Sequence, residues 1–149
     1  MITIHEATEE DLPAVLQLYQ RAGLDGPEEK LSHEEASEIL RAMKRYPSHR
    51  CYLAIEAGVI VGTFTLLIMD NLVHQGARSG ILEGVAVDPA HQGHGIGRIM
   101  MQHAMAEARR HNCYKLSLSS NVKREDAYKF YETLGFELYG YGLSTKLDD

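Results

Sequence analysis

A glycine-rich segment between a predicted strand and a predicted helix carries the clearest chemical signal in the sequence. The apolar run 85–87 ends at Asp88-Pro89, and the segment 92–98 follows with the sequence Gln-Gly-His-Gly-Ile-Gly-Arg. Glycines let the backbone turn so that successive N–H groups converge on one point, which the positive end of the next helix also faces. The segment therefore predicts a site for an anion such as a pyrophosphate.

Two common nucleotide loops do not fit this segment. A P-loop requires lysine and then serine or threonine after its last glycine, but Arg98 and Ile99 follow Gly97. The dinucleotide pattern G-x-G-x-x-G would need a glycine at position 98 or 100, where arginine and methionine stand. The anion is therefore expected to belong to another class of ligand.

Glu83 is a carboxylate inside an otherwise apolar predicted strand. Strand alternation places it on the same face as Ile81, Val85 and Val87, so we expect it to be buried. Burial would raise the pKa of the carboxyl group towards the value that a general base near neutral pH needs. The alternative is an exposed edge-strand glutamate or a salt-bridge partner.

Composition limits the class of protein. The chain has 149 residues, 44 % hydrophobic and 24 % charged, which predicts one globular domain over residues 1–149. A net charge of −6 argues against a nucleic-acid partner, and the absence of an apolar run of ~20 residues argues against a membrane span. Cys51 and Cys113 lack a C-x-x-C pattern and are interpreted as buried small hydrophobes in a cytoplasmic protein without a signal peptide.

The elements that must position these residues alternate between strand and helix. Periodicity, capping boxes and turn residues predict a mixed α/β domain with no internal repeat. The predicted helices begin near Asp11 and at Ser32 and also cover 95–112 and 125–134. The predicted strands are 2–4, a hairpin over 51–69 with a bulge at Gly62, 80–87, 115–118, 136–139 and 143–147.

Three segments in register resemble the GCN5-related N-acetyltransferase (GNAT) family. They are the strand 81–88, the pattern Gln92-x-x-Gly95-x-Gly97, and the run 127–136, Ala-Tyr-Lys-Phe-Tyr-Glu-Thr-Leu-Gly-Phe. Within the family, residues 121–127 are similar to small-molecule enzymes of the aminoalkylphosphonate type. The resemblance covers about residues 80–147. It implies a mixed, mostly antiparallel sheet flanked by helices, with splayed central strands.

The resemblance also implies an acetyl-CoA site. Backbone N–H groups of the loop would hold the CoA pyrophosphate, while Val85 and Val87 would pair with the extended pantetheine arm like an added strand. The loop residues concerned are Gln92, Gly93, His94, Gly95, Ile96, Gly97 and Arg98. Phe130 and Asn121 are further candidates for CoA binding, although the spacing of Asn121 from Tyr131 is longer than the family pattern, and Arg124 competes with it.

Two residues match catalytic positions of the family. Glu83 would remove the proton from the acceptor's ammonium group, and Tyr131 would donate a proton to the CoA sulfur as general acid. The alternative for Tyr131 is a packed helix tyrosine. No metal is expected, because no carboxylate or cysteine completes a cluster with His91 and His94.

We therefore expect an acetyl-CoA-dependent N-acetyltransferase that acts on a primary amine of a small molecule by direct attack in a ternary complex. Two alternatives remain open at this point: an acetyltransferase of protein lysines or N-termini, and a non-catalytic acyl-CoA-binding regulatory protein. The resemblance places the acceptor pocket at residues 24–44 and 71–79 and implies a homodimer.

Overall fold

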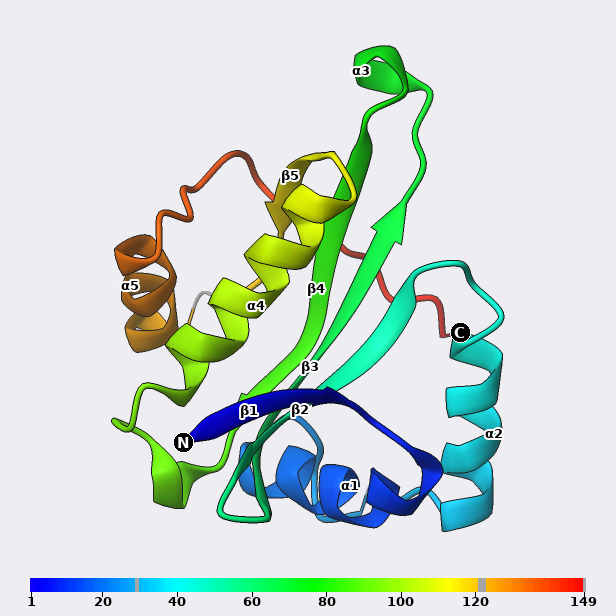
Figure 1. Cartoon of the computed structure of the whole chain (residues 1–149), viewed down its shortest axis with the longest axis vertical. Coiled ribbons are helices and arrows are strands. Elements are labelled where there is room, and N and C mark those ends of the chain that lie inside the picture. The colour runs from blue at the N-terminus through cyan, green and yellow to red at the C-terminus, as the bar shows by residue number, and fades with distance from the viewer. Residues whose placement is uncertain (29, 121–122, 149) are drawn as a thin grey trace. The chain divides into compact units, whose positions relative to one another are not determined.

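The computed structural model of the protein describes residues 1–28, 30–120 and 123–148. The chain forms two compact units, Met1–Leu118 and Ser119–Asp149. In the first unit one sheet has the strand order β1-β2-β3-β4-β5 (Figure 1). Its strands are β1 Ile2–Glu6, β2 His49–Glu56, β3 Val59–Met69, β4 Arg78–Val87 and β5 Cys113–Ser117. Neighbouring strands are antiparallel except β4 and β5, which confirms the predicted mixed, mostly antiparallel sheet.

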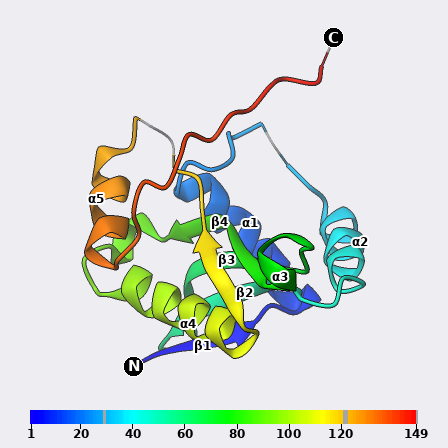
Figure 2. The same cartoon turned by 90° about the horizontal axis from the view of Figure 1, so that it is seen from above.

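Helices cover both faces of this sheet (Figure 2). One face carries α1 (Leu12–Arg21) and α2 (His33–Met43), and the other carries α4 (Ile96–Arg110). Two glycines of the sheet show the close approach of these helices. A Cβ on Gly62 would lie 2.5 Å from the Met100 sulfur of α4, and one on Gly84 would lie 3.6 Å from the Tyr19 hydroxyl of α1.

Local sequence signals account for where these elements begin and bend. The Ser32 side chain accepts a hydrogen bond from the Glu35 N–H at 3.1 Å, and the Ser32 N–H donates to Glu35 at 2.8 Å, which confirms the predicted capping box of α2. The hairpin of β2 and β3 shifts register beside Gly62, which pairs with Ala54 while Ile60 pairs with Ile55. The bulge predicted there is therefore present.

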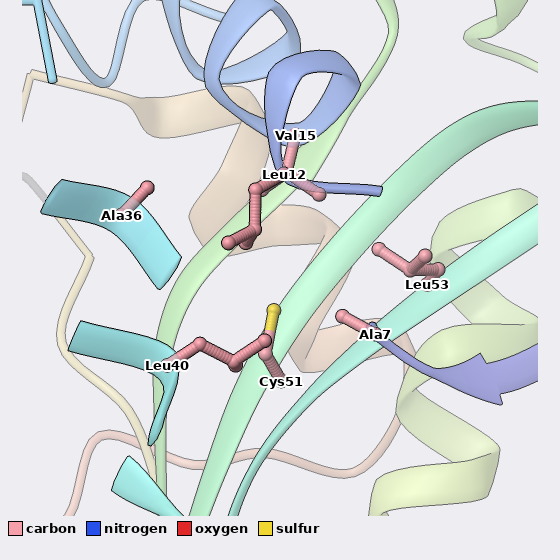
Figure 3. Packing of buried hydrophobic residues seen from close by; sticks show 7 residues of the cluster. All are labelled: Ala7, Leu12, Val15, Ala36, Leu40, Cys51 and Leu53. Carbon is pink, nitrogen blue, oxygen red and sulfur yellow. The ribbon is translucent and has the colours of Figure 1, made fainter. Parts of the chain in front are cut away.

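A buried cluster fixes α1 and α2 on the sheet. Its members come from the end of β1, both helices and β2, as Figure 3 shows: Ala7, Leu12, Val15, Ala36, Leu40, Cys51 and Leu53. Burial of each leucine contributes roughly 2 kcal/mol relative to an exposed side chain. Cys51 is buried as predicted, whereas Cys113 is only half-buried, because it begins the edge strand β5.

The apolar face of α4 is buried against the opposite side of the sheet. Its buried side chains include those that helical spacing placed on one face: Met100, Met101, Ala104 and Ala108. Met100 and Met101 therefore belong to the core. None of the helices in the described part of the chain is long and apolar enough to cross a membrane.

Short turns complete the first unit. They are η1 (Glu9–Asp11), α3 (Val73–Gly76) and η2 (Pro89–His91). The turn α3 is not a regular helix, because His74 and Gln75 have left-handed backbone angles. It occupies the segment 71–79, which the sequence predicts as a loop.

The second unit contains the helix α5 (Glu125–Thr133), which ends where predicted, at Gly135 with a φ of 94°. The strands predicted for 136–139 and 143–147 are wrong, since residues 136–148 have no strand pairing. Their apolar side chains are largely exposed, with Tyr139 at 89 % and Leu143 at 94 %. Alternating apolar residues make a strand only where a neighbouring strand pairs with them.

Candidate functional site

The strand β4 is paired over most of its length on one side only. Its antiparallel partner β3 accompanies it from Ser79 to Val87, whereas the parallel pairing with β5 begins at Arg78 and stops at Ile81 opposite Ser117. Within the described residues, no strand pairs with the second edge of β4 over 82–87. Unpaired strand edges present N–H and C=O groups that an extended, amide-bearing ligand can satisfy.

A bulge at Gly84 changes the direction of the side chains in this strand. Thr65 pairs with Glu83 and Thr63 pairs with Ala86, so β4 has one residue more than β3 over this stretch. Gly84 takes a positive φ of 59°, a backbone conformation that glycine adopts without steric cost. Because of the extra residue, Val85 and Val87 lie on the opposite face from Glu83, and the prediction of a shared face is wrong.

Glu83 is also exposed, contrary to the expectation that it is buried. It pairs with Thr65 of β3 and so lies on the face that α1 covers. Burial therefore does not prepare this group as a base, and any role as a base depends on its place beside the open edge.

The glycine-rich segment follows β4 directly and forms the start of α4. Gly93 and Gly95 have φ values of 86° and 78°, and Gly95 is the N-cap residue of α4. Without a side chain, Gly95 does not cap the helix. A Cβ atom added to Gly95 would have no neighbouring atom within 4 Å, so the space in front of the helix is open. The N–H groups of the first turn, at Ile96, Gly97 and Arg98, therefore have no partner within the helix. They can bind an anion, with the positive end of the helix dipole behind them.

The predicted loop residues differ in how far they are exposed to solvent. Ile96 is buried at 1 % exposure and anchors the start of α4 in the core. Gly97 is half-buried. The other residues of the loop are exposed: Gln92, Gly93, His94, Gly95 and Arg98. Ile96 can therefore contribute only its backbone to a ligand.

Asp88 fixes the loop between β4 and α4. Its N–H donates to the Val61 carbonyl at 2.8 Å, and its carboxylate accepts hydrogen bonds from the Ala90 N–H at 3.0 Å and from Arg21 at 2.9 Å. The hydrogen bond from the Ala90 N–H has the larger effect and the nearby Arg21 guanidinium a smaller one. Together they hold the pKa of this buried carboxyl below its usual value. Sequence reasoning missed Arg21, because 67 positions separate it from Asp88 and no motif joins them.

The predicted general acid belongs to the second unit. The Tyr131 ring lies 5.4 Å from that of Phe130 and 5.6 Å from that of Phe136, measured between centroids. Partial burial raises the pKa of the Tyr131 phenol, while the Arg124 charge acts in the opposite direction. The phenol is therefore protonated at neutral pH and can donate its proton. The predicted CoA-binding residue Asn121 lies outside the described residues.

The histidines of the loop do not assemble a metal site. The rings of His91 and His94 are 6.0 Å apart, and the residues that the structure describes hold no group of three metal-ligating side chains. His91 lies 3.8 Å from the Asp88 carboxylate.

Comparison with known proteins agrees with this geometry. The sequence model of the Acetyltransferase (GNAT) family matches residues 7–136. The chain belongs to this family, and the resemblance seen in its motifs is confirmed.

Individual relatives match at moderate identity. Glucosamine 6-phosphate N-acetyltransferase of Trypanosoma brucei brucei is 35 % identical over 82 residues, which is 55 % of this chain and 54 % of that protein. Aminoglycoside N(6')-acetyltransferase type 1 of Stenotrophomonas maltophilia is 31 % identical over 91 % of this chain and 86 % of that one. A solved structure from Agrobacterium tumefaciens str. C58 has 33 % identity and a TM-score of 0.89, covering 97 % of this chain and 99 % of the other. The match to the trypanosomal enzyme thus spans about half of that enzyme's length.

We predict that Asp88→Asn destabilises the protein in a pH-dependent way. Because folding lowers the pKa of Asp88, the carboxylate stabilises the fold at neutral pH, and this contribution is lost as the pH falls below about 4. Urea unfolding at pH 7, 5 and 3 should show a stability gap between parent and variant that narrows at pH 3. Asp70→Asn removes the partner of an exposed ion pair and is the control, expected to have little effect. A gap of constant size at all three pH values would contradict this role of Asp88.

We also predict that Gly95→Glu abolishes CoA binding, because an anionic side chain would occupy the space in front of the helix N-terminus. Gly95→Ala is the matched control, since it brings the same left-handed strain without a charge and should bind CoA more weakly but measurably. Calorimetry with CoA measures both. Equal affinities of the two variants would show that the loop does not hold the pyrophosphate.

Proposed function

We propose that this protein transfers the acetyl group of acetyl-CoA to a primary amine of a small molecule. One observation carries the proposal: the open edge of β4 over 82–87 runs directly into the anion-binding loop at the start of α4. An extended pantetheine arm fits the strand edge, and the pyrophosphate that follows it fits the loop. Membership of the acetyltransferase family supports this reading.

Acetyl transfer to an amine requires proton transfers, which we assign to Glu83 and Tyr131. Acetyl-CoA supplies the activated thioester. Glu83 takes a proton from the acceptor's ammonium group, directly or through water, so that the amine nitrogen has a free electron pair for attack. As the new C–N bond forms and the C–S bond breaks, Tyr131 donates its phenolic proton to the departing sulfur. The second proton leaves the nitrogen and restores the Tyr131 phenol, and Glu83 releases its proton to solvent. The transfer proceeds by direct attack in a ternary complex, without a covalent enzyme intermediate.

The kind of amine that we propose as acceptor is inferred from the names of the relatives. The two curated relatives reported above carry names that specify small amines, a phosphorylated amino sugar and an aminoglycoside. We propose an acceptor of the same general kind, bound at the face of the sheet that carries Glu83 and α1. The family match over 7–136 spans both compact units, which supports one functional domain.

A panel of amines tests the proposed function. Purified protein with saturating acetyl-CoA is offered glucosamine 6-phosphate, 2-aminoethylphosphonate, kanamycin, spermidine, free amino acids and a lysine-containing peptide, and release of the CoA thiol is measured. Amine-dependent thiol release is expected with at least one small molecule. Release with the peptide alone would favour protein acetylation, and CoA binding without release would indicate a regulatory protein.

Glu83→Gln should lower turnover by ~10²–10⁴ at neutral pH, because the amide keeps the shape of the side chain but cannot take a proton. The loss should diminish as the pH rises and more of the acceptor amine is already neutral, while acetyl-CoA binding should not change. Glu56→Gln in β2 is the control and should have the parental rate. A normal pH–rate profile of Glu83→Gln with a lowered melting temperature would assign Glu83 a structural role.

Tyr131→Phe should lower turnover by ~10²–10⁴ while acetyl-CoA affinity stays close to that of the parent. The substitution removes a proton donor but retains the ring that packs beside Phe130 and Phe136. Tyr128→Phe, on the same helix and 41 % exposed, is the matched control. Equal turnover of the two variants would indicate that water or another group, and not Tyr131, donates the proton to the sulfur.

A further inference from the structure

A tyrosine near the end of α1 lies against the bulge that follows Glu83. A Cβ placed on Gly84 would be 3.6 Å from the Tyr19 hydroxyl and 3.8–3.9 Å from the nearest ring carbons. The main chain of Tyr19 is held as well, because its carbonyl accepts hydrogen bonds from the N–H groups of Leu24 and Asp25 at 2.9 and 3.3 Å. Tyr19 therefore joins the end of α1 and the following segment to the bulge of β4.

The Tyr19 hydroxyl belongs to a polar cluster that reaches Glu83 across the sheet. The side chains of Thr63, Thr65 and Cys51 lie beside it, and hydrogen bonding with the two threonines lowers its pKa. Cys51, Thr65 and Glu83 are direct cross-strand neighbours on β2, β3 and β4, so they form one row on the face that α1 covers. Thr65 thus adjoins the Tyr19 hydroxyl and is also the cross-strand neighbour of Glu83.

The surroundings of Tyr19 keep its phenol neutral. Burial, with further contributions from the nearby Cys51 and Asp25, raises the pKa of this group far above its usual value, although hydrogen bonds with Thr65 and Thr63 oppose the shift. The Thr63 hydroxyl donates to the Tyr52 carbonyl at 2.9 Å. Its one hydrogen is committed there, so Thr63 can only accept a hydrogen bond from the phenol. Because burial also raises the pKa of the Cys51 thiol, both groups are neutral at pH 7.

We propose that Tyr19 is a positioning residue for the acceptor end of the site. Its ring holds the bulge at Gly84 and its hydroxyl holds Thr65, and together these contacts set the Glu83 carboxylate in place for the acceptor amine. The proposal rests on the proposed function, in which Glu83 takes the amine proton. No motif of the sequence marks Tyr19, and none of its contacts requires a bound ligand.

The effect on catalysis follows from geometry. A displacement of about 1 Å at a reacting group lowers the rate by up to about 10²-fold. Tyr19→Phe keeps the ring over Gly84 but leaves Thr65 without its partner, so we expect kcat to fall about tenfold. The dissociation constant for CoA should not change in Tyr19→Phe, because the ring that lies against the bulge of the strand edge 82–87 is retained. Thr65→Val, which removes the same hydrogen bond from the other side, should show the same pattern.

A double-variant comparison tests the proposal with the amine that reacts fastest in the panel. If Tyr19 acts through Glu83, the double variant Tyr19→Phe/Glu83→Gln should be no slower than Glu83→Gln alone. Tyr46→Phe on an exposed side chain is the control and should keep the parental kcat. Hydrogen exchange of the Gly84 and Val85 amides, measured without acceptor, should be faster in Tyr19→Leu, which removes the ring from the bulge, than in the parent.

The outcomes separate this proposal from the proposed function. Rate losses that multiply in the double variant, or unchanged exchange at Gly84 and Val85, would overturn the role of Tyr19 and leave the acetyltransferase assignment intact. Parental turnover of Glu83→Gln would instead overturn the base role of Glu83, and with it the catalytic part of the Tyr19 proposal. The exchange measurement then still decides whether Tyr19 holds the bulge.

Discussion

Backbone N–H and C=O groups need hydrogen-bond partners, and in the described part of the chain β4 has strand partners on only one side from Leu82 to Val87. The rest of the site depends on this constraint. β3 holds the strand in place from one edge, and the second edge remains available to a ligand that can pair like a strand. The same strand then enters the loop that begins α4, so the strand edge and the helix N-terminus form one continuous surface for a long ligand with an anionic end.

The helix α1 connects the two ends of this surface. Arg21 in its last turn contacts Asp88 at the start of the anion loop, and Tyr19, two residues earlier, contacts the bulge beside Glu83. The buried cluster that includes Leu12 and Val15 fixes the helix on the sheet. One element thus adjoins both the loop proposed for CoA and the strand segment that carries the proposed base, so the proposed reaction would depend on the packing of this core.

The sequence predicts those features that local interactions determine. The capping box at Ser32, the bulge at Gly62 and the glycine loop all depend on residues close together in the chain, and the structure contains each of them. It does not predict the bulge at Gly84 or the exposure of Glu83, because strand alternation alone gives no sign of an extra residue or of what covers each face. Arg21 and Tyr19 escape prediction because tertiary packing brings them to the site. The strands expected after Gly135 fail for the related reason that alternation does not supply a pairing partner.

The central claim is that the open edge of β4 and the loop at the start of α4 bind one CoA molecule together. Hydrogen exchange of the backbone amides, with and without saturating desulfo-CoA, tests it most directly. We predict slower exchange in both segments, 82–87 and 93–98, at the same ligand concentration. Saturated binding with unchanged exchange in these two segments would contradict it.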